Sequence, residues 1–435
     1  MTLYIECTYT HYTHLNTGIQ RVVRNIIKEL LPLAEKENIT LELIVLEGQQ
    51  FVRIDRLTPL HVNIKKEMPS KGFKSKLKYV YYEIRKKIAS LFSSYAVKDF
   101  ILAPKYKYGL NYLIDRYITK AFCRPPEPIN MQEGDILLLL DSSWHFKIWD
   151  EVKRFKKSGA HVVSVVYDLI PMTHPEFCSD SLVYFFNDWF PQAFNISDSF
   201  IAISKTVEDD VKTAVAHYNP LGAPGKGYAH FTLGSELNER ALSADIPEDI
   251  VSVFDTAVNT FLFVSTIEPR KNHAYLLDAF EILWKRGADI QLLFVGRLGW
   301  KNEDILQRIY SHPYYNKRLF MFNDLDDSAL LYCYRHAHML LFPSFTEGYG
   351  LPIVESLHYG LPVLASDIAV HHEVGQDKIG YFDIGDPSDL ASKIISIEKN
   401  DVEILAREID TPTWRESAIQ LLHTIQGMQK RSNEK

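Results

Sequence analysis

The sequence predicts an α/β protein made of two doubly wound domains with parallel sheets. Short apolar runs alternate with helical patterns along nearly the whole chain, which is typical of βαβ units. A Gly/Pro-rich cluster, Asn219–Tyr228, separates these runs into two series and indicates a domain junction. The length of 435 residues also suits two or three domains, because a domain typically holds ~100–200 residues.

The apolar runs predict buried strands in both halves of the chain. The first series comprises Leu3–Cys7, Leu41–Leu46, Asp135–Leu140, His161–Asp168 and Ser199–Ser204, and the second comprises Thr260–Thr266, Ile290–Gly296, His338–Ser344 and Leu361–Ser366. Helical patterns follow the first strand of each series, over residues 18–33 and 272–287. We expect one domain over residues 1–230, a second over residues 231–405, and a C-terminal helix within residues 406–435 that packs back on the first domain.

Residues 51–128 interrupt the first series and predict a mainly helical, basic insertion. Between Phe51 and Arg124 the chain has 17 Lys and Arg against 5 Asp and Glu, although its overall net charge is −7. Residues 74–92 interleave Tyr, Ile, Leu and Phe with Lys and Arg, as in a helix that lies on an anionic membrane surface. The alternative is a solvated insertion. Nucleic acid is not expected as a partner, because the rest of the chain is acidic and no nucleic-acid-binding motif accompanies this segment.

The remaining composition predicts a cytoplasmic protein, with peripheral attachment to the inner face of the plasma membrane if residues 74–92 bind lipid. The four cysteines are far apart and form no CxxC pair, so neither a disulfide scaffold nor a cysteine zinc site is expected. The N-terminus has no basic region followed by an apolar one, as a signal peptide would, and no apolar stretch approaches the ~18 residues of a spanning helix.

The segment 343–355, PSFTEGYGLPIVE, follows an expected strand and holds the strongest functional motif. Glu347 and Glu355 are eight residues apart, so the first lies in the loop and the second about two turns into the next helix. Gly348 and Gly350 let the backbone approach a ligand, so that amides at the helix start can face an anion. A carboxylate there can accept hydrogen bonds from sugar hydroxyls. A plain helix start, with Glu347 complementing the helix dipole, is the alternative.

Arg270 and Lys271 follow another expected strand, in the loop sequence EPRKN. Two adjacent cations at the carboxyl end of a strand can neutralise a diphosphate, Arg through its planar fork and Lys as a point charge. An Arg-Lys pair is common on protein surfaces, but its position between a strand and a helix favours an anion site here.

These motifs resemble a known family. Residues 343–366 and 264–280 are similar to the two signatures of retaining glycosyltransferases of the GT-B fold, family 4. The phrases TGIQRVVRNI at residues 17–26 and YDLIPMTHPEF at residues 167–177 resemble bacterial mannosyltransferases that assemble O-antigen or capsule chains. The resemblance implies a GT-B fold, in which two Rossmann-like domains face a central cleft.

The resemblance also implies roles for individual residues. Glu347 would contact hydroxyls of the donor sugar, and Glu355 would bind the nucleotide ribose. Arg270 and Lys271 would bind the donor diphosphate and stabilise the departing nucleotide. Further donor contacts are implied for Gly18, Gly296, Arg297, Gly348, Tyr349 and Gly350, and for the base at residues 322–325.

One position departs from the family pattern. Many members have a histidine in the cleft near the point where this chain has Tyr167 and Asp168. His174, six residues after Asp168, could compensate, so all three residues are candidates for that role. We favour Asp168 as the group that contacts the reacting sugar or the acceptor hydroxyl.

The resemblance therefore implies a retaining hexosyltransferase that moves a sugar, expected to be mannose from GDP-mannose, to a growing or lipid-linked surface glycan. We expect no metal or other cofactor, because the only Asp-x-Asp letters at a promising place, in residues 324–327, precede a helix and predict an N-cap. Arg270 and Lys271 would replace a cation. Two alternatives stay open, namely an epimerase or inverting transferase on the same fold, and a non-catalytic binder of nucleotide sugars or anionic glycolipids. Donor turnover without acceptor and the anomeric configuration of the product would distinguish them.

Overall fold

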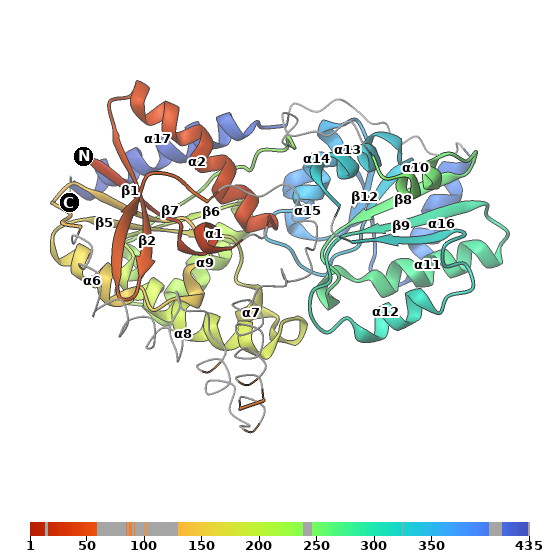
Figure 1. The fold of residues 1–435 in the computed structure, drawn as a ribbon, viewed down its shortest axis with the longest axis horizontal. Coiled ribbons are helices and arrows are strands. Elements are labelled where there is room, and N and C mark those ends of the chain that lie inside the picture. Colours follow the sequence, from red (N-terminus) through yellow and green to blue (C-terminus); the bar gives the residue numbers. More distant parts are fainter. Residues whose placement is uncertain are drawn as a thin grey trace, which may run out of the picture.

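The chain forms two α/β domains that lie side by side (Figure 1). The structure is a computed structural model, which describes residues 1–13, 16–58, 129–237, 246–323, 325–399 and 411–433, together with the single residues 84, 87, 88, 91 and 101. No helix in this described part is both long and apolar enough to cross a membrane.

The first domain contains a seven-stranded sheet in the order β3-β2-β1-β4-β5-β6-β7, in which β3 alone runs antiparallel to its neighbour. Its strands are β1 (Thr2–Glu6), β2 (Thr40–Glu47), β3 (Gln50–Ile54), β4 (Ile136–Leu139), β5 (His161–Val166), β6 (Ser199–Ala202) and β7 (Gly227–His230). The described helices of this domain are α1 (Thr8–Tyr12), α2 (Gly18–Lys36), α6 (Trp149–Lys157), α7 (Ile170–Thr173), α8 (Asp180–Ile196) and α9 (Lys205–Tyr218), with short 3-10 turns at η1 (Ser143–His145), η2 (Pro175–Phe177) and η3 (Ala223–Gly225).

The second domain contains a parallel six-stranded sheet in the order β10-β9-β8-β11-β12-β13. Its strands are β8 (Asn259–Val264), β9 (Ile290–Val295), β10 (Leu319–Phe322), β11 (Met339–Phe342), β12 (Val363–Ser366) and β13 (Gly380–Phe382). Its described helices are α10 (Glu248–Phe254), α11 (His273–Lys285), α12 (Glu303–Tyr310), α13 (Asp327–His336), α14 (Leu351–His358), α15 (Ala369–Gly375) and α16 (Pro387–Glu398), and η5 (Pro269–Lys271) is a 3-10 turn.

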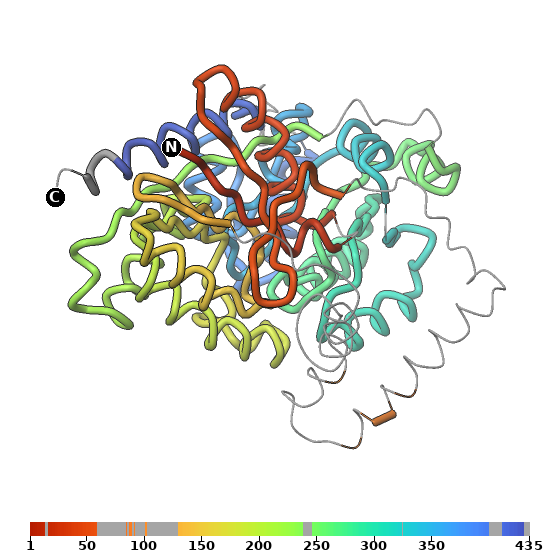
Figure 2. The backbone as a smooth tube through the Cα atoms, turned by 60° about the vertical axis from the view of Figure 1, so that its left-hand side comes forward, coloured from red at the N-terminus to blue at the C-terminus, as the bar shows by residue number. Residues whose placement is uncertain are grey.

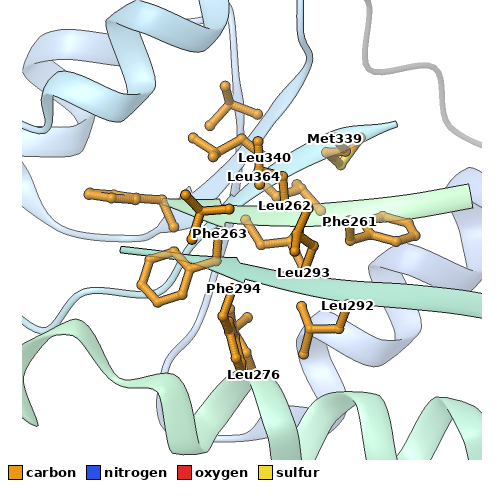
Figure 3. Close-up of a cluster of buried hydrophobic side chains, with 14 of the residues drawn as sticks. Phe261, Leu262, Phe263, Leu276, Leu292, Leu293, Phe294, Met339, Leu340 and Leu364 are labelled. Carbon is orange, nitrogen blue, oxygen red and sulfur yellow. The ribbon is translucent and has the colours of Figure 1, made fainter. Parts of the chain in front are cut away.

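Helices cover both faces of each sheet, which explains why the central strands read as unbroken apolar runs. In the second domain, Phe261 and Phe263 on β8 lie beside Leu292 and Phe294 on β9, and helix α11 adds Leu276 (Figure 3). All five side chains are buried. Each contributes roughly 1.5–3 kcal/mol through burial, so this core holds the loops at the strand ends on a rigid base.

The C-terminal helix α17 (Trp414–Asn433) packs on the first domain, although it follows the second in sequence. Figures 1 and 2 both show it beside the N-terminal part of the chain. Thr232 donates its amide N–H to Gln420 Oε1 at 3.0 Å, and the Trp414 indole donates to the Glu236 carbonyl at 2.9 Å. The chain therefore crosses between the domains twice.

The predicted fold is confirmed, and one sequence prediction needs correction. The Gly/Pro cluster, which indicated a nearby domain junction, runs into β7, an edge strand of the first sheet. The first residues of the expected helical insertion form β3, because a turn at Gly48 (φ +66°) folds them back onto β2. Apart from the single residues named above, the predicted insertion lies outside the described residues from residue 59 to 128. Asp326 caps α13 by accepting from the Ala329 amide at 2.9 Å, as predicted for this loop.

Candidate functional site

A cavity of about 300 Å³ lies between the two domains, at the carboxyl ends of their strands. Ligands bind at this edge of open α/β sheets. The walls come from the loops after β5, β8, β9 and β11 and from the start of α2. Eleven residues predicted from sequence as catalytic or donor-binding line it, namely Gly18, Asp168, Arg270, Lys271, Gly296, Arg297, Glu347, Gly348, Tyr349, Gly350 and Glu355.

Glu347 forms the centre of a buried cluster of charges. Its carboxylate accepts a hydrogen bond from Arg270 Nη1 at 2.7 Å and also pairs with Lys271 Nζ. Burial opposes ionisation of Glu347, but Arg270 and Lys271 outweigh it and hold the pKa of that carboxyl well below its usual range. Burial and the neighbouring Arg270 lower the pKa of Lys271. The cluster is thus an ionised carboxylate between two cations.

Two loops of the second domain bring these charges together. Arg270 and Lys271 lie in η5, directly before α11, and Glu347 lies between β11 and α14. The Phe345 amide donates to the Arg270 carbonyl at 2.9 Å, which joins the two loops. Glu268 forms an ion pair with Arg270 Nε at 2.6 Å and thereby orients the guanidinium.

Asp168 faces this cluster from the first domain. It follows β5, lines the cavity, and accepts a hydrogen bond from the Ile170 amide at 3.0 Å. Burial raises the pKa of Asp168, although Arg270 opposes the rise. A carboxyl group from one domain is therefore placed opposite the cations of the other.

The other two candidates for the cleft histidine's role do not present their polar groups to the cavity. Tyr167 is among the lining residues, but its hydroxyl donates to the Leu140 carbonyl at 2.7 Å and its ring is buried in the core of the first domain. His174 is not among the residues that line the cavity, and its ring stacks on Phe177 at 6.1 Å. Of the three candidates, Asp168 is the one that presents its side-chain charge to the site.

Glu355 joins the domains through a partner that the sequence did not reveal. Its Oε1 accepts from Arg21 Nη2 of the first domain at 2.7 Å, and its Oε2 accepts from the Tyr334 hydroxyl at 2.7 Å. The Glu355 side chain is 1% exposed and the Arg21 side chain 16%. Arg21 lies in the first turn of α2, at the glycine-containing N-terminus that lines the cavity, and this position was its only sequence signal.

The glycines at the site serve contacts within the protein. A Cβ at Gly348 would lie 2.1 Å from the Tyr167 carbonyl oxygen, and one at Gly296 would lie 1.6 Å from the Ser265 carbonyl oxygen. Gly350 has a φ of +104° at the start of α14, which side chains rarely tolerate. Gly348 was expected to let the backbone approach a ligand. This expectation is incomplete, because the missing side chain also lets the backbone of the first domain approach.

The other predicted donor contacts lie at the start of α2 and in the loop after β10. Gly18 and Thr17 line the cavity at the start of α2, where the Thr17 side chain makes no capping hydrogen bond. Leu325 lines the cavity, whereas Asp324 lies outside the described residues. Within the described ranges, no three His, Cys, Asp or Glu side chains are grouped as a metal ion would need.

The second domain is similar to a known protein family. Residues 247–411 match the family model described as "Glycosyl transferases group 1". The chain is 30% identical over 333 residues to the serotype-specific mannosyltransferase WbdA of Escherichia coli, an alignment that covers 74% of this chain and 40% of that protein. It is also 30% identical over 162 residues to the O-antigen chain mannosyltransferase B of Escherichia coli, covering 36% and 38% of the two chains. The chain therefore spans about two fifths of the length of these relatives.

Solved structures share the complete two-domain fold. Sucrose-phosphate synthase from Thermosynechococcus elongatus superposes with a TM-score of 0.55 at 15% identity, covering 100% of this chain and 97% of that one. Anabaena HepE in complex with UDP-glucose superposes with a TM-score of 0.52 at 14% identity, covering 100% and 98%. At such identities the likeness concerns the fold, and it confirms the predicted GT-B arrangement.

Proposed function

We propose that the protein transfers a hexosyl group from a nucleotide diphosphate sugar to a hydroxyl of a glycan or glycolipid, and the match of residues 247–411 to the group 1 glycosyltransferase family model supports this. The observation that carries the proposal is the Arg270–Lys271–Glu347 cluster facing Asp168 across a cavity between two domains. The relatives named as mannosyltransferases support mannose as the sugar and, by extension, GDP-mannose as the donor. They also support a growing or lipid-linked surface glycan as the acceptor.

In this proposal, each part of the donor lies against cavity residues of complementary charge or hydrogen-bonding capacity. The diphosphate lies against Lys271 and Arg270, where the cations gain most as negative charge develops on the departing nucleotide. Glu347, ionised between those cations, accepts hydrogen bonds from hydroxyls of the sugar. Asp168 approaches the reacting sugar or the acceptor hydroxyl from the first domain.

In the proposed reaction, the bond between the anomeric carbon and the diphosphate oxygen breaks, and a bond to the acceptor oxygen forms on the same face of the sugar. The proton of the acceptor hydroxyl passes to the departing phosphate. The protein contributes positioning and charge stabilisation, and Lys271 with Arg270 takes the part that a metal cation plays elsewhere. Retention of configuration and independence from metal are parts of the proposal.

A donor screen tests the assignment. GDP-mannose, GDP-glucose, UDP-glucose and UDP-N-acetylglucosamine are compared for thermal stabilisation, since a ligand at 100 times its dissociation constant adds ~2.7 kcal/mol. The stabilising donor is then incubated with and without a soluble mannoside acceptor. We expect stabilisation by GDP-mannose and release of GDP only with acceptor. Conversion of the donor sugar without acceptor would instead indicate an epimerase, and binding without any turnover would indicate a non-catalytic binder.

We further propose that residues 74–92 attach the enzyme to the inner, anionic face of the plasma membrane, where a lipid-linked acceptor is available. Ile84, Ile88 and Leu91 have the i, i+4, i+7 spacing of one helix face and are all exposed, and Lys87 beside them is exposed too. Each basic residue near an anionic surface contributes ~1 kcal/mol.

Liposome binding tests this attachment. Changing the basic side chains of the segment to Glu should abolish binding to phosphatidylserine vesicles at low salt while sparing activity on a soluble acceptor; the changed positions are Lys74, Lys76, Lys78, Arg85, Lys86 and Lys87. A wild-type protein that ignores such vesicles would contradict the attachment and leave the insertion as a solvated segment.

A further inference from the structure

The segment that follows Glu347 contacts the first domain. Ser204, at the start of α9, donates its hydroxyl to the Gly348 carbonyl at 2.8 Å. Gly348 lies so close to the Tyr167 backbone that a side chain would not fit. A few residues later, Val354 packs into the apolar core of the first domain. Figure 1 shows α14, which continues this segment, on the side of the second domain that faces the first.

Tyr349 is the main anchor of this segment. Its side chain is 6% exposed, and its ring belongs to the buried cluster of the first domain that also contains Ile203 and Leu233. Its hydroxyl donates to the Leu233 carbonyl at 3.4 Å, a long hydrogen bond, so apolar burial of the ring accounts for most of the contact. The same burial raises the pKa of the Tyr349 hydroxyl to about 12, so the hydroxyl stays protonated at neutral pH.

The anchor lies two residues from Glu347, which points toward Arg270 and Lys271 of its own domain. Only Gly348 lies between Glu347 and Tyr349 in the chain, so a displacement of the Tyr349 ring also displaces the Glu347 backbone. Asp168 belongs to the first domain, so the distance between Asp168 and Glu347 depends on where that ring is seated.

We propose that Tyr349 is a positioning residue, whose ring seats the Glu347 loop in the first domain and so sets Glu347 in register with Asp168. This inference rests on the proposed glycosyl transfer. Nucleotide binding needs chiefly the second domain, where Arg270 and Lys271 lie, and should not require the seated ring. Transfer needs both domains in register, and a misplacement of about 1 Å can cost on the order of 10² in rate.

Three tyrosine variants separate these effects. Tyr349→Phe keeps the ring, Tyr349→Ala removes it, and Tyr310→Ala, at a 47% exposed position on α12, is the matched control. GDP and UDP binding is measured by calorimetry, and kcat and KM are measured with GDP-mannose and a soluble mannoside. We expect Tyr349→Ala to lose on the order of 10² in kcat while the nucleotide dissociation constant changes less than about threefold. Tyr310→Ala should stay within about threefold of wild type, and Tyr349→Phe should recover most of the kcat that Tyr349→Ala loses, because it keeps the ring.

A second variant keeps the test decisive if Tyr349→Ala does not fold. Ser204→Ala removes the hydroxyl that holds Gly348 from the first domain and that also accepts from the Val207 amide at the start of α9. It should lower kcat without weakening nucleotide binding. The proposal is overturned if a folded Tyr349→Ala keeps normal kcat, if nucleotide binding and kcat fall in parallel, or if Ser204→Ala leaves kcat unchanged. A wild-type protein that transfers no sugar would instead contradict the proposed function. The nucleotide titrations do not depend on transfer and therefore distinguish this result from a failure of the Tyr349 proposal.

Discussion

Replacing Arg21 by glutamine should lower kcat/KM for sugar transfer on the order of 100-fold, because it removes one partner of an ion pair that joins the domains. Arg21 Nη2 lies 2.7 Å from Glu355 Oε1, and neither side chain is more than 16% exposed. Breaking a buried pair in this way costs about 3–5 kcal/mol. We take about 3 kcal/mol, since Tyr334 still donates to Glu355 and the pair lines a cavity that water can enter. At ~1.4 kcal/mol for each factor of ten, this corresponds to roughly 10².

Loss of the Arg21–Glu355 pair should destabilise the arrangement in which the two domains meet, because Glu355 can be hydrated when the domains separate. The assay is a double-mutant cycle of Arg21→Gln and Glu355→Gln, with kcat/KM measured for each variant. Arg308→Gln is the matched control, since Arg308 pairs with Asp278 and Glu281 on the exposed surface of the second domain, where such pairs contribute about 0–1 kcal/mol. Arg21→Gln within threefold of wild type, or single effects that simply add, would contradict a role of this ion pair in joining the domains.

Three further predictions concern the charges of the site and of the first domain. Lys271→Ala should lower kcat more than it weakens GDP binding, because the leaving group is most charged in the transition state, and an unchanged kcat would remove Lys271 from the mechanism. Activity should persist in EDTA because Lys271 and Arg270 neutralise the diphosphate, whereas a loss restored by Mg²⁺ would contradict this. Burial, and next the neighbouring Asp141, raise the pKa of Glu6 from 4.5 to about 7, so the folded state keeps a proton that the unfolded chain has released. Stability should therefore fall by up to about 3 kcal/mol between pH 5 and 8 in urea titrations, and less in Glu6→Gln; parallel curves would contradict the assignment.

Much of the donor side of the site could be predicted from sequence, because its determinants are local. Arg270, Lys271 and Glu347 each lie in a loop directly after a run of apolar residues, and parallel strands bring such loops to one edge. The second domain also has short connections, so the order of its strands and helices could be predicted from the sequence.

Contacts between the domains could not be predicted in this way. Arg21 and Glu355 are 334 positions apart, and nothing in either local pattern indicates the other. Tyr349 reads as part of a ligand-binding loop, yet its ring is buried in the core of the first domain. Strand β7 was hidden for a different reason. A Cβ at Gly227 would lie 2.6 Å from Ser199 Oγ, so a glycine, which gives no strand signal in the sequence, suits the close packing of β7 on β6.

The most direct test of the proposed sugar transfer follows the sugar itself. GDP-mannose labelled with ¹³C at the anomeric carbon is mixed with a soluble mannoside acceptor, and the product is observed by NMR for the wild-type protein and for Glu347→Ala. We expect an α-mannoside that forms only when acceptor is present, and a rate lowered on the order of 10² or more in a folded Glu347→Ala. A β-linked product, or an α-mannoside formed at the same rate by Glu347→Ala, would contradict it.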